Sequence, residues 1–352
     1  MPFYQDIKHD EATYPPGERE YIASRLLDLR QVLEARIPER ELRRTLVLGT
    51  WNIRDFDDNK FGQGPRRRES LHYIAEVLAR FDICAVQEIN DKLKPLKDVV
   101  KLMGPSYEFM ATDVTMGTSG NNERLAFIYD TRKVQFRNVV GELVLPATRQ
   151  GETRQIARTP LVASFQAGWF KFTICTAHIY YGKDSRTSPE YARRVNEIAT
   201  IAGILAKRAK EEGENYIFLG DFNVIDREDA TFKALADAGF FVPDELQGSN
   251  MAGDRSYDQI AFQGKKDELI ALSAGVFDYR LAVFRDEDFV RYKAGLPQKS
   301  ESGAPLDLST DEKRLAHYRK WRTWQISDHL PLWVQFEVDF SDAYLEGIAK
   351  GA

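Results

Sequence analysis

The chain has 352 residues, of which 43% are hydrophobic and 29% are charged. This composition is ordinary for a globular protein, and it excludes disorder as the state of most of the chain. The formal net charge of −5 argues against a protein that binds nucleic acid through bulk electrostatic attraction alone, although local basic patches are compatible with it.

The first twenty residues lack the basic-then-apolar pattern of a signal segment, and no apolar run approaches the length of a membrane span. Cys84 and Cys175 each lie within an apolar run, which predicts buried free thiols and suits a reducing compartment. We therefore expect a cytoplasmic protein.

Residues 1–44 are predicted to form an N-terminal extension with one helix. From Glu18 the apolar residues are spaced as on a helix, and Pro38 ends the pattern. The helix would cover a sheet edge or serve as a surface for a partner, and both interpretations stay open.

From Thr45 onward, strand-like apolar runs alternate with two helical segments, near Glu69–Arg80 and Pro189–Glu211. Two runs within residues 160–178 are joined through Ala-Gly and have the pattern of a β-hairpin. Strands that pair directly, mixed with strand–helix–strand connections, predict an α/β protein with mixed β-sheets. We expect one domain over residues 45–340 and a C-terminal tail over residues 341–352.

An insertion is predicted over about residues 286–325. Its first part, Asp286 to Thr310, is rich in Gly, Pro, Ser and charges and reads as a long loop. Residues 313–324 then read KRLAHYRKWRTW, with no acid among the basic side chains. Such a run is usually a solvated helix face, but its position just before Ser327-Asp328-His329 also fits a segment that holds a phosphodiester backbone.

Glu88 ends the apolar run ICAVQE, where a charge is unfavourable unless it has a cation or donor as partner. Alone, such a side chain would merely reach solvent. A hard divalent ion such as Mg²⁺ is bound by one or two carboxylates with water and substrate phosphate, so Glu88 is a candidate metal ligand.

Asp221 and Asn223 follow the apolar run YIFLG. On an extended chain, residues two apart point to the same face. The carboxylate would orient or deprotonate water, and the amide would donate to a phosphoryl oxygen as negative charge builds. The alternative is a turn that uses these side chains for its own hydrogen bonds.

His178 and His329 stand at two further strand ends, and the chain has only five histidines. Two imidazoles can act as a general base and acid, or as donors to a phosphate, and each then needs an orienting carboxylate. Glu123, directly before the run RLAFIYD, and Asp258, within SYDQIAF, are the available acids. An Asp inside an apolar run is unfavourable unless it is paired, which favours a supporting role for Asp258. Asp328 would turn to the other side, towards metal or phosphate, since adjacent residues on a strand alternate.

Taken in order, these residues resemble the endonuclease/exonuclease/phosphatase superfamily with the deoxyribonuclease I-like fold, and most closely its deoxyribonuclease I branch. The resemblance covers about residues 45–338. It implies a four-layer sandwich of two mixed β-sheets flanked by helices, Mg²⁺ or Mn²⁺ as cofactor, and in-line attack of water on a phosphoester.

The resemblance also implies roles for individual residues. The motif WNIRDF is similar to the branch's Asn-Ile-Arg opening and makes Asn52 a phosphate-side or metal-side residue and Arg54 a contact to DNA. Arg158 resembles an Arg that contacts phosphate. Glu88 matches the metal ligand, and Asp328 is expected to join it. The remaining matches are catalytic or supporting: Glu123, His178, Asp221, Asn223, Asp258 and His329.

Two positions depart from the branch. Asn121 stands where the branch has a Tyr that stacks in the minor groove, and Asn90 stands where it has an Arg. The chain also offers no candidates for the disulfides of secreted members. The catalytic residues therefore match more fully than the DNA-contacting surface, which Arg54, residues 66–68, Arg158 and the basic run would have to replace.

The sequence predicts a metal-dependent phosphodiesterase, with nucleic acid as the expected substrate. One alternative keeps the fold but takes a phosphomonoester or a lipid headgroup, as inositol-phosphate phosphatases and sphingomyelinases of the superfamily do. Another is a catalytically silent binding protein, against which the complete set of site residues argues.

Overall fold

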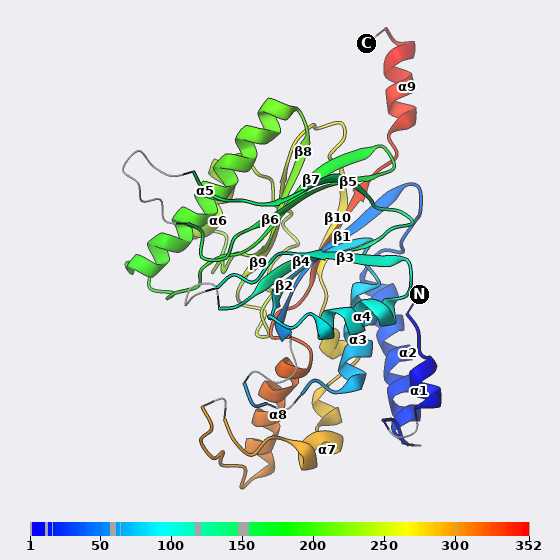
Figure 1. The fold of residues 1–352 in the computed structure, drawn as a ribbon, viewed down its shortest axis with the longest axis vertical. Coiled ribbons are helices and arrows are strands. Elements are labelled where there is room, and N and C mark those ends of the chain that lie inside the picture. Colours follow the sequence, from blue (N-terminus) through cyan, green and yellow to red (C-terminus); the bar gives the residue numbers. More distant parts are fainter. Residues whose placement is uncertain are drawn as a thin grey trace.

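The computed structural model describes residues 2–10, 13–15, 17–56, 61–63, 65–116, 121–146, 155–300 and 302–351. Two β-sheets of six and five strands form the centre, and helices flank them (Figure 1). The predicted fold class, a sandwich of two mixed sheets flanked by helices, is confirmed. None of the helices in these ranges is both long enough and apolar enough to cross a membrane.

The first sheet has the strand order β10-β11-β1-β2-β4-β3. Strands β1 and β2 are parallel, whereas the other neighbours pair antiparallel. The six strands are β1 Thr45–Phe56, β2 Ile83–Ile89, β3 Tyr107–Ala111, β4 Arg124–Asp130, β10 Ala271–Val276 and β11 Leu332–Glu337.

The second sheet has the order β5-β6-β7-β8-β9 and again contains one parallel pair, β7 with β8. The predicted hairpin over residues 160–178 is confirmed, because β6 and β7 pair antiparallel. Its turn contains Gly168 at φ +56, where a Cβ would lie 2.9 Å from the carbonyl oxygen of Val338. The five strands are β5 Gln135–Glu142, β6 Leu161–Ala167, β7 Phe170–His178, β8 Asn215–Asp221 and β9 Asp258–Gln263.

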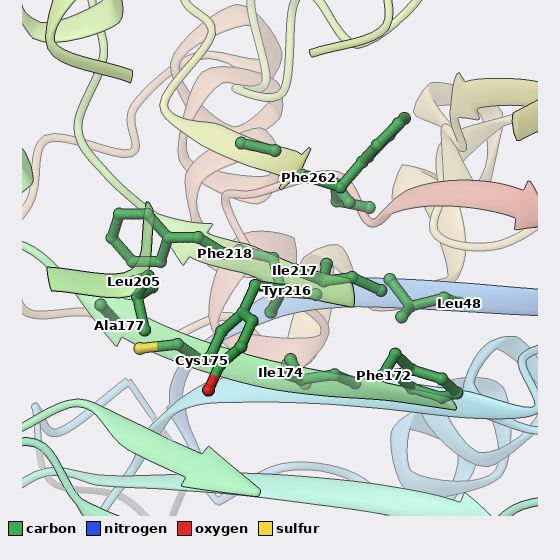
Figure 2. Packing of buried hydrophobic residues seen from close by; sticks show 14 of the residues in the cluster. Leu48, Phe172, Ile174, Cys175, Ala177, Leu205, Tyr216, Ile217, Phe218 and Phe262 are labelled. Carbon is green, nitrogen blue, oxygen red and sulfur yellow. The ribbon is translucent and has the colours of Figure 1, made fainter. Parts of the chain in front are cut away.

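The main hydrophobic core contains apolar side chains from both sheets. Figure 2 shows Leu48 of β1 beside Phe172 and Ile174 of β7, with Ile217 of β8 next to them. Each such side chain stabilises the fold by about 1.5–3 kcal/mol when fully buried. Cys175 belongs to this core and Cys84 to a second one, and both are free thiols as predicted.

The helices cover the outer faces. Helices α1 Gln5–His9, α2 Glu18–Arg36, α3 Arg68–Leu78 and α4 Lys94–Met103 contribute to a second core with the first sheet, and α5 Pro189–Glu212 and α6 Ala230–Asp237 pack on the second sheet (Figure 1). Leu26, Leu29 and Leu33 of α2 are buried in that second core. The extension therefore packs on the main body, and the division into extension, domain and tail stays a prediction.

The expected loop from Asp286 to Thr310 is partly helical. It contains the short helices η2 Asp286–Asp288, α7 Phe289–Tyr292 and η3 Lys293–Gly295, whereas residues 296–310 contain no helix in their described part. The aromatic side chains explain the difference, because Tyr292 stacks on Tyr318 at 5.9 Å and both are buried. Tyr318 belongs to α8 Asp311–Gln325; the remaining helices are η1 Tyr279–Leu281 and α9 Ser341–Ala349, which extends away from the body (Figure 1).

Candidate active site

Polar side chains gather where the parallel strands of both sheets end. Asn52 of β1 donates its amide to Oε1 of Glu88, at 2.8 Å, and to Oδ2 of Asp221, at 2.9 Å. Glu88 belongs to the first sheet and Asp221 to the second. One amide group therefore links the carboxylates of the two sheets at this edge.

Glu88 has an unusual backbone conformation for its residue type, with φ +59. The pairing of β2 with β4 shifts register between Val86 and Ile89, which is the sign of a bulge. A non-glycine residue in this region stores about 1–3 kcal/mol of strain, and a bulge re-aims a side chain. The second oxygen of Glu88 accepts from the backbone N–H of Asp55 at 2.9 Å. The two hydrogen bonds to Glu88 therefore fix the orientation of its carboxylate.

His178 is oriented by a carboxylate that has several partners. Its Nδ1 lies 2.7 Å from Oε2 of Glu123. Glu123 also forms an ion pair with Arg158 at 2.7 Å and accepts from the amide of Asn121 at 2.6 Å. Burial alone would raise the pKa of Glu123, but His178, Arg158 and Asn121 lower it to about 2. Glu123 is therefore ionised, and Arg158 lies behind His178 as part of its support.

His329 is oriented in the same way by Asp258, with Nδ1 2.7 Å from Oδ2. Its backbone is held by Ser327, whose Oγ accepts from the N–H of His329 at 2.9 Å and donates to the carbonyl of Asn52 at 2.6 Å. Burial raises the pKa of Asp258. Burial lowers the pKa of His329, but Asp258 and Asp221 outweigh it and raise that pKa well above the usual imidazole value.

Asp221 lies between the two imidazoles. Its Oδ2 is 3.5 Å from Nε2 of His178 and 3.7 Å from Nε2 of His329. Burial opposes the charged form, but the His329 and His178 imidazoles and the amide of Asn52 lower the pKa of Asp221. Burial and Arg158 likewise lower the pKa of His178, and Glu123 and Asp221 raise it above its ordinary value. The site thus holds a buried carboxylate between two imidazoles that favour their charged forms.

The extended-chain argument for Asp221 and Asn223 is wrong. Strand β8 ends at Asp221, and Asn223 has φ +53. The backbone N–H of Asn223 donates to Oδ1 of Asp221 at 3.0 Å, and its side-chain amide donates to the carbonyl of Ile179 at 2.9 Å. A tight turn, the alternative that the sequence left open, therefore brings the backbone of Asn223 to the Asp221 carboxylate.

Arg54 and Asp328 lie beside the site and contact each other, with 3.4 Å between Nε and Oδ2. The Arg54 guanidinium lies 3.6 Å from the ring centroid of Trp324 and donates to Oγ1 of Thr323 at 2.5 Å. The Asp328 side chain is 38% exposed. Arg54 therefore connects this carboxylate to the end of α8.

The site offers oxygen ligands that suit a hard divalent ion. One group of donor atoms, from Glu88, His178 and Asp221, lies within 4.8 Å, and another comes from Asp221, Asp258 and His329. Oδ1 of Asn52 is buried and has no hydrogen-bond partner in the described part of the chain. Carboxylate and amide oxygens are suitable Mg²⁺ or Mn²⁺ ligands, so Asn52 and Glu88 fit the expected ion. Asp328 belongs to neither group.

The basic run before the site is not unopposed. Arg319 and Arg322 pair with Asp286, and Lys313 pairs with Asp307. Asp286 and Asp307 precede α8, and Arg314 pairs with Asp311 in the first turn of α8. All three acids lie outside residues 313–324, so the run itself gave no sign of them. The interpretation of this run as a solvated helix face holds for only part of α8, because Arg322 is buried.

Two residues near the site had no predicted role. Trp51 donates its indole N–H to the carbonyl of His329 at 2.9 Å, and Ser327 joins β1 to the His329 backbone. Ser327 directly precedes Asp328-His329, and Trp51 directly precedes Asn52. Their position next to these motifs was the one sequence signal that could have identified Trp51 and Ser327 as site residues.

The comparisons with known proteins agree with this arrangement. A model of the endonuclease/exonuclease/phosphatase family matches residues 49–324. Deoxyribonuclease gamma of Rattus norvegicus is 24% identical over 262 residues, which cover 69% of this chain and 80% of that protein.

Two solved structures from Bacteroides thetaiotaomicron share the fold. An endonuclease/exonuclease/phosphatase family protein has a TM-score of 0.56 at 18% identity and covers 84% of this chain and 99% of its own. A mannosyl-6-phosphatase has a TM-score of 0.53 at 18% identity and covers 83% and 99%.

Proposed function

Since the chain belongs to the endonuclease/exonuclease/phosphatase family and is a hydrolase of phosphoester bonds, we propose that it is a metal-dependent phosphodiesterase acting on nucleic acid. The observation that carries the proposal is Asp221 between the Nε2 atoms of His178 and His329, at 3.5 and 3.7 Å. Each imidazole is itself oriented by a carboxylate at 2.7 Å. In-line displacement at a phosphoester needs a group that orients the attacking water. It also needs groups that stabilise the negative charge on the phosphoryl oxygens.

We assign the activation of the attacking water to Asp221. Its lowered pKa keeps the carboxylate ionised at neutral pH, and an ionised carboxylate orients water and accepts its proton. The pKa values of His178 and His329 are raised, which favours protonated imidazoles as donors to the phosphoryl oxygens. An Nε2 proton of this pair is also available to the leaving oxygen, which would release a 3′-hydroxyl and a 5′-phosphate from nucleic acid.

The remaining residues bind and orient. Asn52 and Glu88 would hold Mg²⁺ or Mn²⁺, and the bound ion supplies positive charge that favours the negative phosphoryl oxygens in the transition state. Asn223 would donate to phosphate. Arg158 supports Glu123, and Arg54 would contact the substrate backbone, with Asp328 holding its guanidinium. In this assignment Asp328 acts on Arg54 and not as a metal ligand.

Nucleic acid is the proposed substrate because the relative from Rattus norvegicus is a deoxyribonuclease. A small phosphomonoester is the second candidate, and one observation favours it. The basic side chains Lys313, Arg319 and Arg322 already have acid partners, which reduces their attraction for a long phosphate backbone.

A substrate panel tests the proposal. Plasmid DNA, single-stranded RNA, bis-p-nitrophenyl phosphate, sugar phosphates, inositol phosphates and sphingomyelin are each incubated with Mg²⁺, with Mn²⁺ and with EDTA. We expect cleavage of nucleic acid and of the diester with either metal, no cleavage with EDTA, and none by Asp221→Ala. Hydrolysis of monoesters alone would replace the nuclease proposal by the phosphatase alternative, and inactivity on every substrate would overturn both.

A further inference from the structure

Helix α5, which lies outside the second sheet (Figure 1), carries an arginine that is completely buried. Arg194 has 0% of its side chain exposed. Arginine is almost never fully buried unless its charge is paired and its donors are satisfied. The partners of Arg194 therefore explain why it is there.

The guanidinium of Arg194 donates mainly to backbone carbonyls. Nε lies 3.0 Å from the oxygen of Tyr181, Nη1 lies 2.9 Å from the oxygen of Asn223, and Nη2 lies 3.0 Å from the oxygen of Lys183. Asp184 supplies the countercharge, with Oδ1 3.3 Å from Nη1. A planar fork of five N–H groups can satisfy several carbonyls at once in fixed directions.

These carbonyls belong to the two loops that leave the catalytic strands. Tyr181 and Lys183 follow β7, which ends at His178, and Asn223 follows β8, which ends at Asp221. The two loops also contact each other, because the N–H of Ile179 donates to the carbonyl of Asp221 at 2.8 Å. Arg194 therefore joins both chain segments directly behind the side chains that we assign to chemistry.

The turn at Asn223 needs such support. Asn223 has φ +53, a conformation that stores about 1–3 kcal/mol of strain and persists when the surroundings determine it. Its N–H holds Oδ1 of Asp221 and its amide holds the carbonyl of Ile179. The hydrogen bond from Arg194 fixes the remaining backbone polar group of this residue, its carbonyl.

Glu197, three residues further along α5, lies on the same face. It is buried, and its carboxylate accepts from the backbone N–H of Tyr180 at 3.2 Å and from that of Ala157 at 3.1 Å. Ala157 precedes Arg158, which pairs with Glu123 behind His178. A basic and an acidic side chain of one helix thus hold carbonyls and amides of three segments around the site.

We propose that Arg194 is a positioning residue for the hydrolytic reaction, with Glu197 as its counterpart on the same helix face. Arg194 sets the relative placement of His178, Asp221 and Asn223 by fixing the loops that carry or adjoin them. The inference rests on the proposed function, because positioning has meaning only where those side chains act together. It differs from a general stabilising role in its prediction that the loss appears in kcat of folded protein.

The chemistry of the fork predicts how substitutions behave. Lysine keeps the charge but has a single nitrogen, so it cannot reach carbonyls in three directions. Methionine fills part of the space and leaves the carbonyls without donors. Because a displacement of about 1 Å at reacting groups can change the rate by about 100-fold, we expect kcat to fall about 10-fold for Arg194→Lys and about 100-fold for Arg194→Met.

Arg40 provides the matched control. Its side chain is also largely buried and binds Asp82 at 2.6 Å and Asp130 at 2.5 Å. Asp82 directly precedes β2 and Asp130 ends β4, at the sheet end opposite to Glu88. Arg40→Met should therefore reduce the melting temperature at least as much as Arg194→Met while leaving kcat within about 2-fold of wild type.

The experiment measures kcat and KM on bis-p-nitrophenyl phosphate with Mg²⁺, together with amide hydrogen exchange by mass spectrometry. We expect both Arg194 variants to lower kcat with KM changed less than about 3-fold, and exchange to increase in residues 179–184 and 221–224. In Arg40→Met exchange should increase near residues 82 and 130 instead. If Arg194→Met does not fold, Arg194→Lys and Glu197→Gln carry the same test.

Unchanged kcat in folded Arg194→Lys and Arg194→Met, or exchange that increases uniformly along the chain, would show that Arg194 only stabilises the fold. If wild type hydrolyses no substrate, the proposed function fails. The exchange pattern then still decides whether Arg194 orders the two loops, and unchanged exchange there would overturn the inference independently.

Discussion

The two halves of the site contain the same pair of groups in different surroundings. In one half Glu123 orients His178, and in the other Asp258 orients His329, both at 2.7 Å. Glu123 has further donors in Arg158 and Asn121. In contrast, Oδ1 of Asp258 is buried and has no hydrogen-bond partner in the described ranges.

The difference affects the protonation of the two carboxyl groups. The donors around Glu123 outweigh its burial and lower its pKa to about 2, whereas burial raises the pKa of Asp258. The two histidine–carboxylate distances are therefore equal, although hydrogen-bond donors offset the cost of burying the charge at Glu123 and do not offset it at Asp258. Hydrogen-bond length alone does not define what an orienting acid contributes, and substitutions should separate the two halves.

The largest effect is expected at the residue that both halves share. Asp221→Asn removes the charge that faces both imidazoles, so we expect kcat to fall about 100- to 10,000-fold in steady-state assays. Asp226→Asn is the control, because Asp226 is partly exposed and pairs with Arg186. A variant at position 221 that keeps a tenth of the wild-type rate would contradict the shared role.

Glu123→Gln should cause the next largest effect, on stability. Gln places an NH₂ group against the donors of Arg158 or Asn121. It also removes a carboxylate whose pKa is lowered from 4.5 to about 2. This shift corresponds to about 3 kcal/mol of unfolding free energy. Urea denaturation at pH 7 should show this loss.

The pH dependence of stability tests whether the pKa of Glu123 is lowered. Because the folded-state pKa is lowered, the stabilisation by Glu123 is fully present above its ordinary value and is lost as the pH falls towards about 2. The difference in stability between wild type and Glu123→Gln should therefore shrink from pH 5 downwards. A difference that stays constant to pH 3 would argue against an ionised, compensated Glu123.

Asn121→Gly should have a smaller effect. Asn121 donates to Glu123 and has φ +57, a conformation that glycine adopts readily. The substitution therefore removes the hydrogen bond to Glu123 without backbone strain, and we expect the unfolding free energy to fall by about 1 kcal/mol. Asn122→Gly, at φ +56, is the matched control for the backbone change, and equal effects at both positions would assign the loss to glycine itself.

Asp258→Asn should change stability least. The Asn side chain keeps an oxygen for Nδ1 of His329, and its NH₂ group would take the place of the unpartnered Oδ1. Because burial raises the pKa of Asp258 in the folded state, its ionised form disfavours folding at neutral pH. The neutral Asn removes this cost, which offsets the loss of the charge that faces His329, so the unfolding free energy should change by less than about 1 kcal/mol in urea. A loss as large as that of Glu123→Gln would remove the contrast between the halves.

The sequence predicted the fold class and much of the site because these features follow local patterns. Apolar periodicity located α5 and the β6–β7 hairpin, and polar residues at the ends of apolar runs located Glu88, His178 and Asp221. The sequence also offered Glu123 and Asp258 as the acids that the two histidines need, and the family resemblance implied their supporting roles.

Other features depend on contacts that periodicity does not encode. The positive φ of Glu88 and Asn223 arises from a bulge and a turn, and an apolar run does not show where its strand stops being extended. The acids that pair with Arg319, Arg322 and Lys313 of α8 lie at residues 286 and 307, before the helix. Arg194 stands in an ordinary charged stretch of sequence, and its burial results from carbonyls of two separate loops.

The amide of Asn52, which reaches Glu88 in one sheet and Asp221 in the other, has a consequence for the order of events during synthesis. Asn52 leaves the ribosome long before His329 and the strand β11 that pairs with β1. With the proposed roles, a nascent chain remains inert until both sheets have closed on each other. Hydrolytic activity would then appear late and all at once, as a property of the finished protein.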